Sequence, residues 1–90
     1  MNETPRGFFR RRPGNPVECA QFFSHRAREL CGIAQFDQSA GVFFVTGRAG
    51  PLVLSDGDWI VAELDGTLTT MSDDTFLKAY EKVHADGQDG

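Results

Sequence analysis

Apolar residues recur along the chain in short groups, and most of these groups have the spacing of β-strands. Residues 17–22 begin by alternating apolar and polar side chains, which is typical of a strand with one buried face. Residues 42–45 are continuously apolar and of strand-forming types, so we expect a central strand buried on both faces. Residues 52–54 form a shorter apolar group between turn-forming residues. The pattern therefore predicts a fold made mainly of strands.

A β-hairpin is predicted in the second half of the chain, between residues 59–64 and residues 67–71. The two strands are joined by Asp65-Gly66, a dipeptide typical of two-residue turns. We expect a type I′ turn, because Asp and Gly both tolerate the positive φ angles that this turn needs at its central residues. A second acidic turn, Asp56-Gly57, precedes the hairpin.

Two helices are predicted, and both are short. Residues 23–31 place apolar side chains at i, i+4, i+7 and i+8, the stripe of an amphipathic helix, and Ser24 is a suitable N-cap. A second helix is predicted near residues 75–79, with its N-cap among residues 72–74. Residues 80–83 are expected to leave this helix as an extended end.

Length and composition indicate one α+β domain. The chain has 90 residues, of which 40% are hydrophobic and 24% charged, as in globular proteins. We expect residues 16–83 to form a small twisted antiparallel sheet of about four to six strands, with one crossing helix and a short C-terminal helix. Residues 1–15 are expected to be a flexible basic arm, and residues 84–90 a disordered tail.

The predicted sheet carries large apolar side chains on both faces. Alternation along a strand places Trp59 and Ile60 on opposite faces, and Phe43 and Phe44 likewise. One good helix can cover only one face. Either the sheet curls into a small barrel, or a partner covers the second face. A homodimer is the simplest such partner.

The charge is acidic overall and unevenly distributed. The formal net charge is −4. Residues 1–30 contain six arginines and three glutamates, a balance of +3, whereas residues 31–90 contain three basic and ten acidic residues, a balance of −7. An acidic protein is poorly suited to the phosphate backbone, so we expect no nucleic-acid partner and consider a basic protein partner instead.

The sequence predicts a cytoplasmic protein without membrane association. It contains no run of about 18 apolar residues that would predict a membrane-spanning helix. Phe8-Phe9 is followed at once by three arginines rather than by the apolar core of a signal peptide. Cys19 and Cys31 are expected to be reduced core residues.

Residue types that carry catalysis are present, but not in catalytic patterns. Acidic residues cluster over residues 56–74, yet those at turns and at the helix cap have a structural role there. The spacing of His25 and His84 from the two cysteines matches no common zinc pattern. Cys31 lies on the apolar stripe of its helix, where burial would raise the pKa of a nucleophilic thiol. We expect neither an enzyme nor a metal or other cofactor.

Four motifs in this order resemble a family of small proteins encoded by tailed phages and prophages. That family has a PVVIEAFQW-type strand, a helix ending near Cys-Gly, a Pro-Gly-Asp-Tyr-Gly-like turn and a "D-x-F…TYEPV" close. The matching segments here are PVECAQF (16–22), LCG (30–32), GDWIV (57–61) and DTFLKAYEKV (74–83). The chain departs from the family at Asp56, where Pro is usual, and at Thr69-Thr70, where Tyr-Pro is frequent. The resemblance implies a phage accessory gene, and the family has no assigned activity.

The function we expect is non-enzymatic binding of a host protein in the host cytoplasm, which blocks that protein during host takeover or counters host defence. The predicted contact residues are Trp59, Phe43, Arg10, Arg11, Arg12, Asp56, Asp58 and Asp65. One alternative is a nucleotide-signal sponge. In that case arginines at a subunit interface would bind phosphate. The candidates are Arg6, Arg10–Arg12, Arg26 and Arg28. The other alternative is a minor virion or assembly protein.

Overall fold

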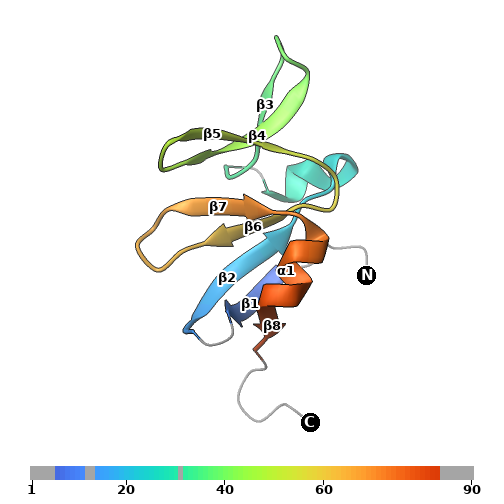
Figure 1. Cartoon of the computed structure of the whole chain (residues 1–90). Coiled ribbons are helices and arrows are strands. Elements are labelled where there is room, and N and C mark those ends of the chain that lie inside the picture. The colour runs from blue at the N-terminus through green and yellow to red at the C-terminus, as the bar shows by residue number, and fades with distance from the viewer. Residues whose placement is uncertain (1–5, 12–13, 31, 84–90) are drawn as a thin grey trace.

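The computed structural model describes residues 6–11, 14–30 and 32–83, which form a mostly-β α+β fold (Figure 1). The strands are β1 (Arg6–Arg11), β2 (Pro16–Gln21), β3 (Gln35–Asp37), β4 (Val42–Gly47), β5 (Gly50–Leu54), β6 (Trp59–Ala62), β7 (Leu68–Met71) and β8 (Tyr80–Lys82). The helices are the 3₁₀ helix η1 (Ser24–Leu30) and the α-helix α1 (Asp73–Ala79). The expected fold class is confirmed, but the strands form two antiparallel sheets rather than one, and neither is a closed barrel.

The larger sheet has five strands in the order β7-β6-β2-β1-β8. β1 lies inside it and pairs with β2 on one side and β8 on the other. The expected flexible arm over residues 1–15 is therefore wrong for residues 6–11. Phe8-Phe9 is consistent with either a short edge strand or an anchor for the arm, but the interior position of β1 was not expected, because its partner on one side, β8, lies about 70 residues further along the chain. Residues 1–5 and 84–90 lie outside the described residues.

The smaller sheet has three strands in the order β3-β4-β5. It lies next to β7 in the upper part of the view, where the β3–β4 hairpin projects from the molecule (Figure 1). Only β4 and β5 had been expected. β3 was missed because it has three residues, of which Phe36 alone is apolar, and such a segment has no periodicity to detect.

The helix expected over residues 23–31 is a 3₁₀ helix with a kink at Arg26, where φ is −123°. A helix of two turns has few intrahelical bonds, so packing decides its form. Leu30, on the expected apolar stripe, is buried. The expected cap Ser24 acts differently: its N–H and hydroxyl both donate to the Asp56 carboxylate, at 2.9 and 3.3 Å.

The C-terminal helix agrees closely with the expectation. Ser72 is the N-cap of α1, and its hydroxyl oxygen accepts a hydrogen bond from the N–H of Thr75. Two aspartates follow in the first turn, where the helix dipole favours negative charge. Tyr80 then leaves the helix with an extended backbone and begins β8.

The hairpin at Asp65-Gly66 is present, but the expected type I′ turn is wrong. Gly66 has a φ of +91°, and no described residue other than glycine has a positive φ. The carboxylate of Asp65 accepts hydrogen bonds from the N–H and the hydroxyl of Thr67, at 3.0 and 2.7 Å. These bonds hold Asp65 in an ordinary conformation. The N–H of Glu63 donates to Thr67 O, so a three-residue loop with one left-handed glycine reverses the chain.

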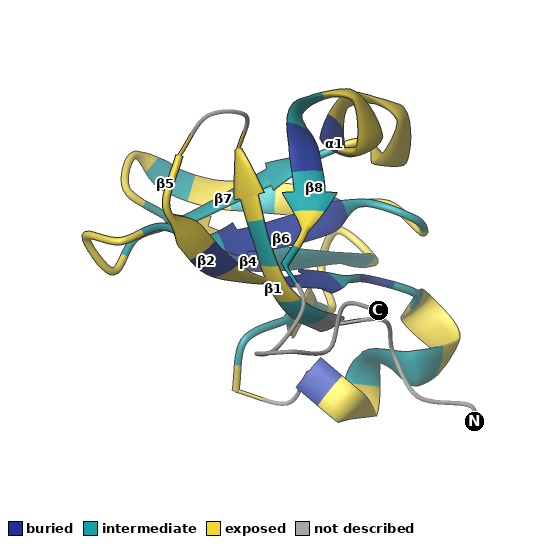
Figure 2. Ribbon diagram, turned by 90° about the horizontal axis from the view of Figure 1, so that it is seen from below, coloured by how far each residue is buried: buried dark blue, intermediate teal, exposed yellow. Residues whose placement is uncertain are grey.

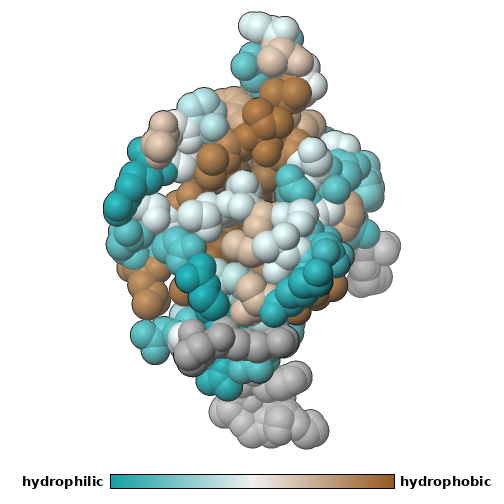
Figure 3. Space-filling model, viewed as in Figure 1, coloured by the Kyte–Doolittle hydropathy of each residue, from teal (hydrophilic) through white to brown (hydrophobic). Residues whose placement is uncertain are grey.

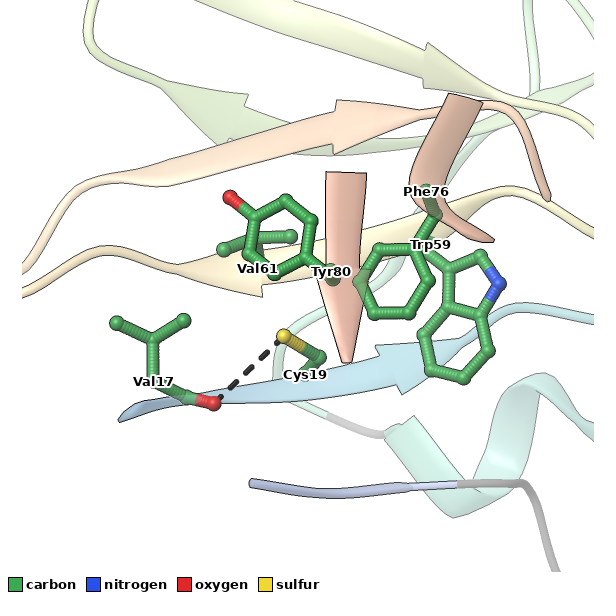
Figure 4. Packing of buried hydrophobic residues seen from close by; sticks show 6 residues of the cluster. All are labelled: Val17, Cys19, Trp59, Val61, Phe76 and Tyr80. Atoms are coloured by element: carbon green, nitrogen blue, oxygen red, sulfur yellow. Dashed lines mark hydrogen bonds between the residues drawn. The ribbon is translucent and has the colours of Figure 1, made fainter. Parts of the chain in front are cut away.

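Both faces of the larger sheet are covered by other parts of the chain. Large apolar side chains can therefore lie on both faces without the sheet closing into a barrel. On one face, α1 covers the cluster shown in Figure 4: Val17, Cys19, Trp59, Val61, Phe76 and Tyr80. On the other face, the smaller sheet and η1 cover a second cluster: Ala20, Phe22, Leu30, Val45, Leu54 and Ile60. Figure 2 shows buried positions concentrated on the central strands β2 and β6.

Candidate interaction surface

The three-stranded sheet has one face toward the core and one toward solvent. Val45 and Leu54 are buried in the second cluster, and Phe43 packs against it. Because side chains alternate along a strand, the residues between them point away from the core. In this register Phe44 lies opposite Gln35 on β3 and opposite Val53 on β5.

We call this solvent side the outer face. Its residues are Gln35, Asp37, Val42, Phe44, Thr46, Pro51 and Val53. Phe44 and Val42 are half-buried, whereas Val53 is 59% exposed. Asp37 is the one charged residue among the seven, and its Oδ1 accepts hydrogen bonds from the N–H groups of Ser39 and Ala40, at 2.9 and 3.2 Å. Figure 3 shows hydrophobic side chains gathered over the three-stranded sheet in the upper half of the molecule.

Phe43, an expected contact residue, points to the opposite side of the same sheet. Its ring lies between two others, with centroids 5.2 Å from Phe22 and 4.8 Å from Phe36. Phe22 is buried, Phe43 is half-buried, and Phe36 is 51% exposed. The three rings form an aromatic row that leads from the core to the surface at β3.

Trp59, the other expected apolar contact, lies in the core. It is 5% exposed, and its ring stacks on Phe76 with a centroid distance of 4.0 Å and an interplanar angle of 7° (Figure 4). Its indole N–H donates to Asp73 in α1 at 2.8 Å. A partner could reach the ring only after α1 had moved, so the structure gives Trp59 a packing role in place of the expected contact role.

The described arginines that were expected to contact a partner instead contact residues of the larger sheet. Arg10 forms a 2.6 Å ion pair with Glu81 across the β1–β8 pairing. Arg11 donates to the hydroxyl of Tyr80 at 3.2 Å, and its guanidinium lies 5.5 Å from the centroid of that ring. Arg12 lies outside the described residues. The structure therefore gives the two described arginines a role in joining β1 to the C-terminal strand.

The acidic turn residues serve the turns, as their positions in the sequence indicated. Asp56 holds the start of η1, and Asp58 accepts from the N–H of Ser55 at 2.9 Å. Asp65 accepts from Thr67 and forms a 2.7 Å ion pair with Arg48, which links the β6–β7 turn to the β4–β5 turn. The hydrogen bonds from Thr67 lower the pKa of Asp65.

A shallow groove of about 670 Å³ lies beside these turns. Arg11 and Arg48 line it, but so do the carboxylates of Glu63 and Asp65. Both arginines already have partners within the chain. Positive charge is therefore not concentrated in this groove in the way that phosphate binding requires. Arg26 and Arg28, which the sponge alternative also invoked, lie on η1.

Cys19 has none of the properties of a nucleophile. Burial, with smaller effects from Glu63 and Glu18, raises the pKa of its thiol to about 12. Cys31 and His84 lie outside the described residues. Within residues 6–11, 14–30 and 32–83, no group of three or more His, Cys, Asp and Glu side chains is arranged to hold a metal ion.

Comparison with known proteins gives no match. The sequence fits no protein-family model, and neither a curated protein nor a solved structure shows significant similarity to it. The phage resemblance therefore stays a prediction. In the part of the chain that the structure describes, no helix is both long and apolar enough to cross a membrane.

Sequence reasoning missed the main residues of the outer face. The opposite orientation of Phe43 and Phe44 was expected, but it did not reveal which of them points to solvent. That depends on which face of the smaller sheet packs on β6 and η1, a tertiary contact that no local pattern encodes. Val53 was missed because it lies in a short strand with few neighbours that would show which of its residues point outward.

Proposed function

We propose that this chain works by binding another protein through the outer face, without catalysing a reaction. The observation that supports this proposal is the composition of that face. Its apolar side chains Val42, Phe44, Pro51 and Val53 are uncharged neighbours on one surface of an acidic protein. Exposed apolar groups that lie together on a sheet are typical of protein-binding surfaces.

The acidity of the chain as a whole indicates the chemistry of the partner. The formal net charge is −4, although residues 35–54, which form the three-stranded sheet, contain only one acidic and one basic residue. A partner with an apolar centre and basic residues around it would gain both burial and attraction between opposite charges. Following the phage resemblance, we propose that the partner is a host protein and that binding blocks it in the host cytoplasm.

Capture from a bacterial lysate with matched variants tests this proposal. Val53→Asp places a charge on the outer face at an exposed site, so the fold is retained. Leu77→Asp places the same charge at an equally exposed apolar residue of α1, at 58% against 59%. The expected result is one stoichiometric protein captured by the native chain and by Leu77→Asp, with at least a tenfold loss for Val53→Asp. Equal capture by both variants, or capture of no protein by the native chain, contradicts the proposal.

A further inference from the structure

The outer edge of β3 differs from the other sheet edges of the described chain. Exposed edges are normally protected from pairing by proline, by charged side chains or by covering segments. β5 contains Pro51, which lacks an N–H, and β8 contains Glu81 and Lys82. The four residues of β7 are all half-buried, beside the smaller sheet. β3 is Gln-Phe-Asp and pairs only with β4 among the described strands. It is short and has one charged side chain, Asp37, whose Oδ1 accepts hydrogen bonds from the N–H groups of Ser39 and Ala40, and its central residue is the apolar Phe36.

Phe36 at the centre of β3 exposes a large apolar surface at this edge. One side of its ring contacts Phe43, and 51% of the residue remains exposed. A strand added beside β3 would place a side chain directly against Phe36 on the same face of the sheet. The exposed half of the ring is therefore positioned to contact a side chain of an added strand.

The sequence of β3 is complementary to itself in one antiparallel register. With Phe36 at the centre, Gln35 lies opposite Asp37 of the partner subunit, and Asp37 lies opposite Gln35 of the partner subunit. Oδ1 of Asp37 accepts from the N–H groups of Ser39 and Ala40, so the Gln35 amide of the partner subunit would donate to Oδ2 of the carboxylate. A register centred on Asp37 would instead bring two carboxylates together, which is unfavourable. Charge therefore selects the register centred on Phe36.

We infer that a second copy of this chain pairs along β3, which joins the two three-stranded sheets into one six-stranded sheet. The pairing is isologous, as is typical of homodimers. Its two-fold axis is perpendicular to the sheet, so both outer faces lie on the same side and form one surface of twice the area. Because an edge of three residues buries less than the roughly 800 Å² per partner of a stable complex, we expect a reversible dimer.

Sedimentation equilibrium of the purified full-length chain, over protein concentrations from about 5 to 500 μM, tests this inference. We expect the weight-average mass to rise with concentration from 9.9 kDa toward twice that value. Gln35→Asp places carboxylates opposite each other, so it should weaken dimerisation at least tenfold, with partial recovery in about 1 M salt, where charges are screened. Phe36→Asp should abolish the dimer. Circular dichroism would show that both variants remain folded, since both sites are exposed.

Val53→Asp is the matched control, because it adds the same charge to the same sheet but away from the β3 edge. It should dimerise like the native chain, even if it no longer captures a partner protein. The inference is overturned if the native chain stays at 9.9 kDa throughout. It is equally overturned if Gln35→Asp and Phe36→Asp dimerise normally, or if Val53→Asp abolishes the dimer. Val53→Asp tests the proposed function, whereas Gln35→Asp and Phe36→Asp test this inference, so the failure of one can be distinguished from the failure of the other.

Discussion

The indole N–H of Trp59 donates a 2.8 Å hydrogen bond to Oδ1 of Asp73, the first residue of α1. The same oxygen accepts a 3.1 Å hydrogen bond from the amide of Gln21 at the end of β2. One carboxylate oxygen therefore fixes the start of the helix to two adjacent strands of the larger sheet. It also gives a buried indole N–H the partner that it needs away from water.

Replacing Asp73 with alanine should destabilise the fold by about 1–3 kcal/mol, because it leaves the indole N–H without its acceptor. Asp74→Ala is the control. It removes a carboxylate from the same helical turn and loses only an exposed ion pair with Lys78, worth about 0.5 kcal/mol or less. Urea denaturation followed by tryptophan fluorescence measures both variants. Equal losses of stability would show that helix-dipole charge, rather than the Trp59 bond, is what Asp73 contributes.

Phe76 is the side chain on which the first cluster depends most. It is 1% exposed, and its ring lies in contact with those of Trp59, Tyr80 and Phe9, at centroid distances of 4.0, 4.8 and 5.0 Å. Phe76→Ala should cost about 3–5 kcal/mol, because it opens a cavity that aromatic neighbours cannot easily fill. The adjacent Leu77→Ala, at an exposed site, should cost less than about 1 kcal/mol. Thermal melts of the two variants would contradict this account if their midpoints were similar.

Gly66 has a conformational role in the β6–β7 turn. Its φ of +91° is unfavourable for residues with a Cβ, whereas the space around it is open. Gly66→Ala should therefore destabilise the chain by about 1 kcal/mol through backbone strain alone. Gly66→Asn should cost less, because asparagine tolerates this region better. Chemical denaturation of both variants provides the measurement, and an asparagine variant less stable than the alanine one would show that strain is not the cause.

The buried thiol of Cys19 makes stability fall in alkaline solution. Its pKa of about 12 lies above the value of 9.0 for a free thiol. Between these values the unfolded chain has lost a proton that the folded chain retains, so the free energy of unfolding decreases as pH rises. The decrease is at most about 1.4 kcal/mol per pH unit. Below pH 9 this group should have no effect.

The measurement for Cys19 is the urea midpoint at intervals from pH 7 to pH 11. Cys19→Ala is the control: its stability is lower at neutral pH, but the part of the alkaline slope that comes from the thiol should be absent. In a Cys31→Ser background, a thiol reagent at pH 8 should modify Cys19 only after unfolding. Rapid modification of the native protein would contradict the burial on which the prediction rests.

The sequence predicted the elements whose pattern is local. Alternation and apolar runs located β2, β4, β5, β6 and β7, and Ser72 was among the expected N-cap positions of α1. Of the strands that were not expected, β3 is too short to show a pattern, whereas β1 depends on a distant partner. β1 is rich in arginine, which is not typical of a strand inside a sheet. Only the folded chain shows that Arg10 lies opposite Glu81 and Arg11 opposite Tyr80 in the pairing with β8.

The same division applies to the candidate surface. Phe43 and Trp59 were expected as contacts because they are large and lie on strands, but size alone does not distinguish a core residue from a surface one. Trp59 is covered by a helix whose position depends on Asp73, and Phe44 faces solvent because Val45 takes the place against the core. Both outcomes follow from how the second sheet and α1 pack, which is a property of the whole chain.

The pairing of β1 with β8 has a consequence for how the chain is made. Arg11 lies opposite Tyr80, so the larger sheet cannot be completed until almost all of the sequence from residue 6 to residue 82 is present. Contacts over such separations slow folding, because a long loop must close before they form. During synthesis on the ribosome, β1 is therefore made first and cannot pair with β8 until that strand has also been made. The sheet is finished as one of the last events after synthesis of the C-terminal strand.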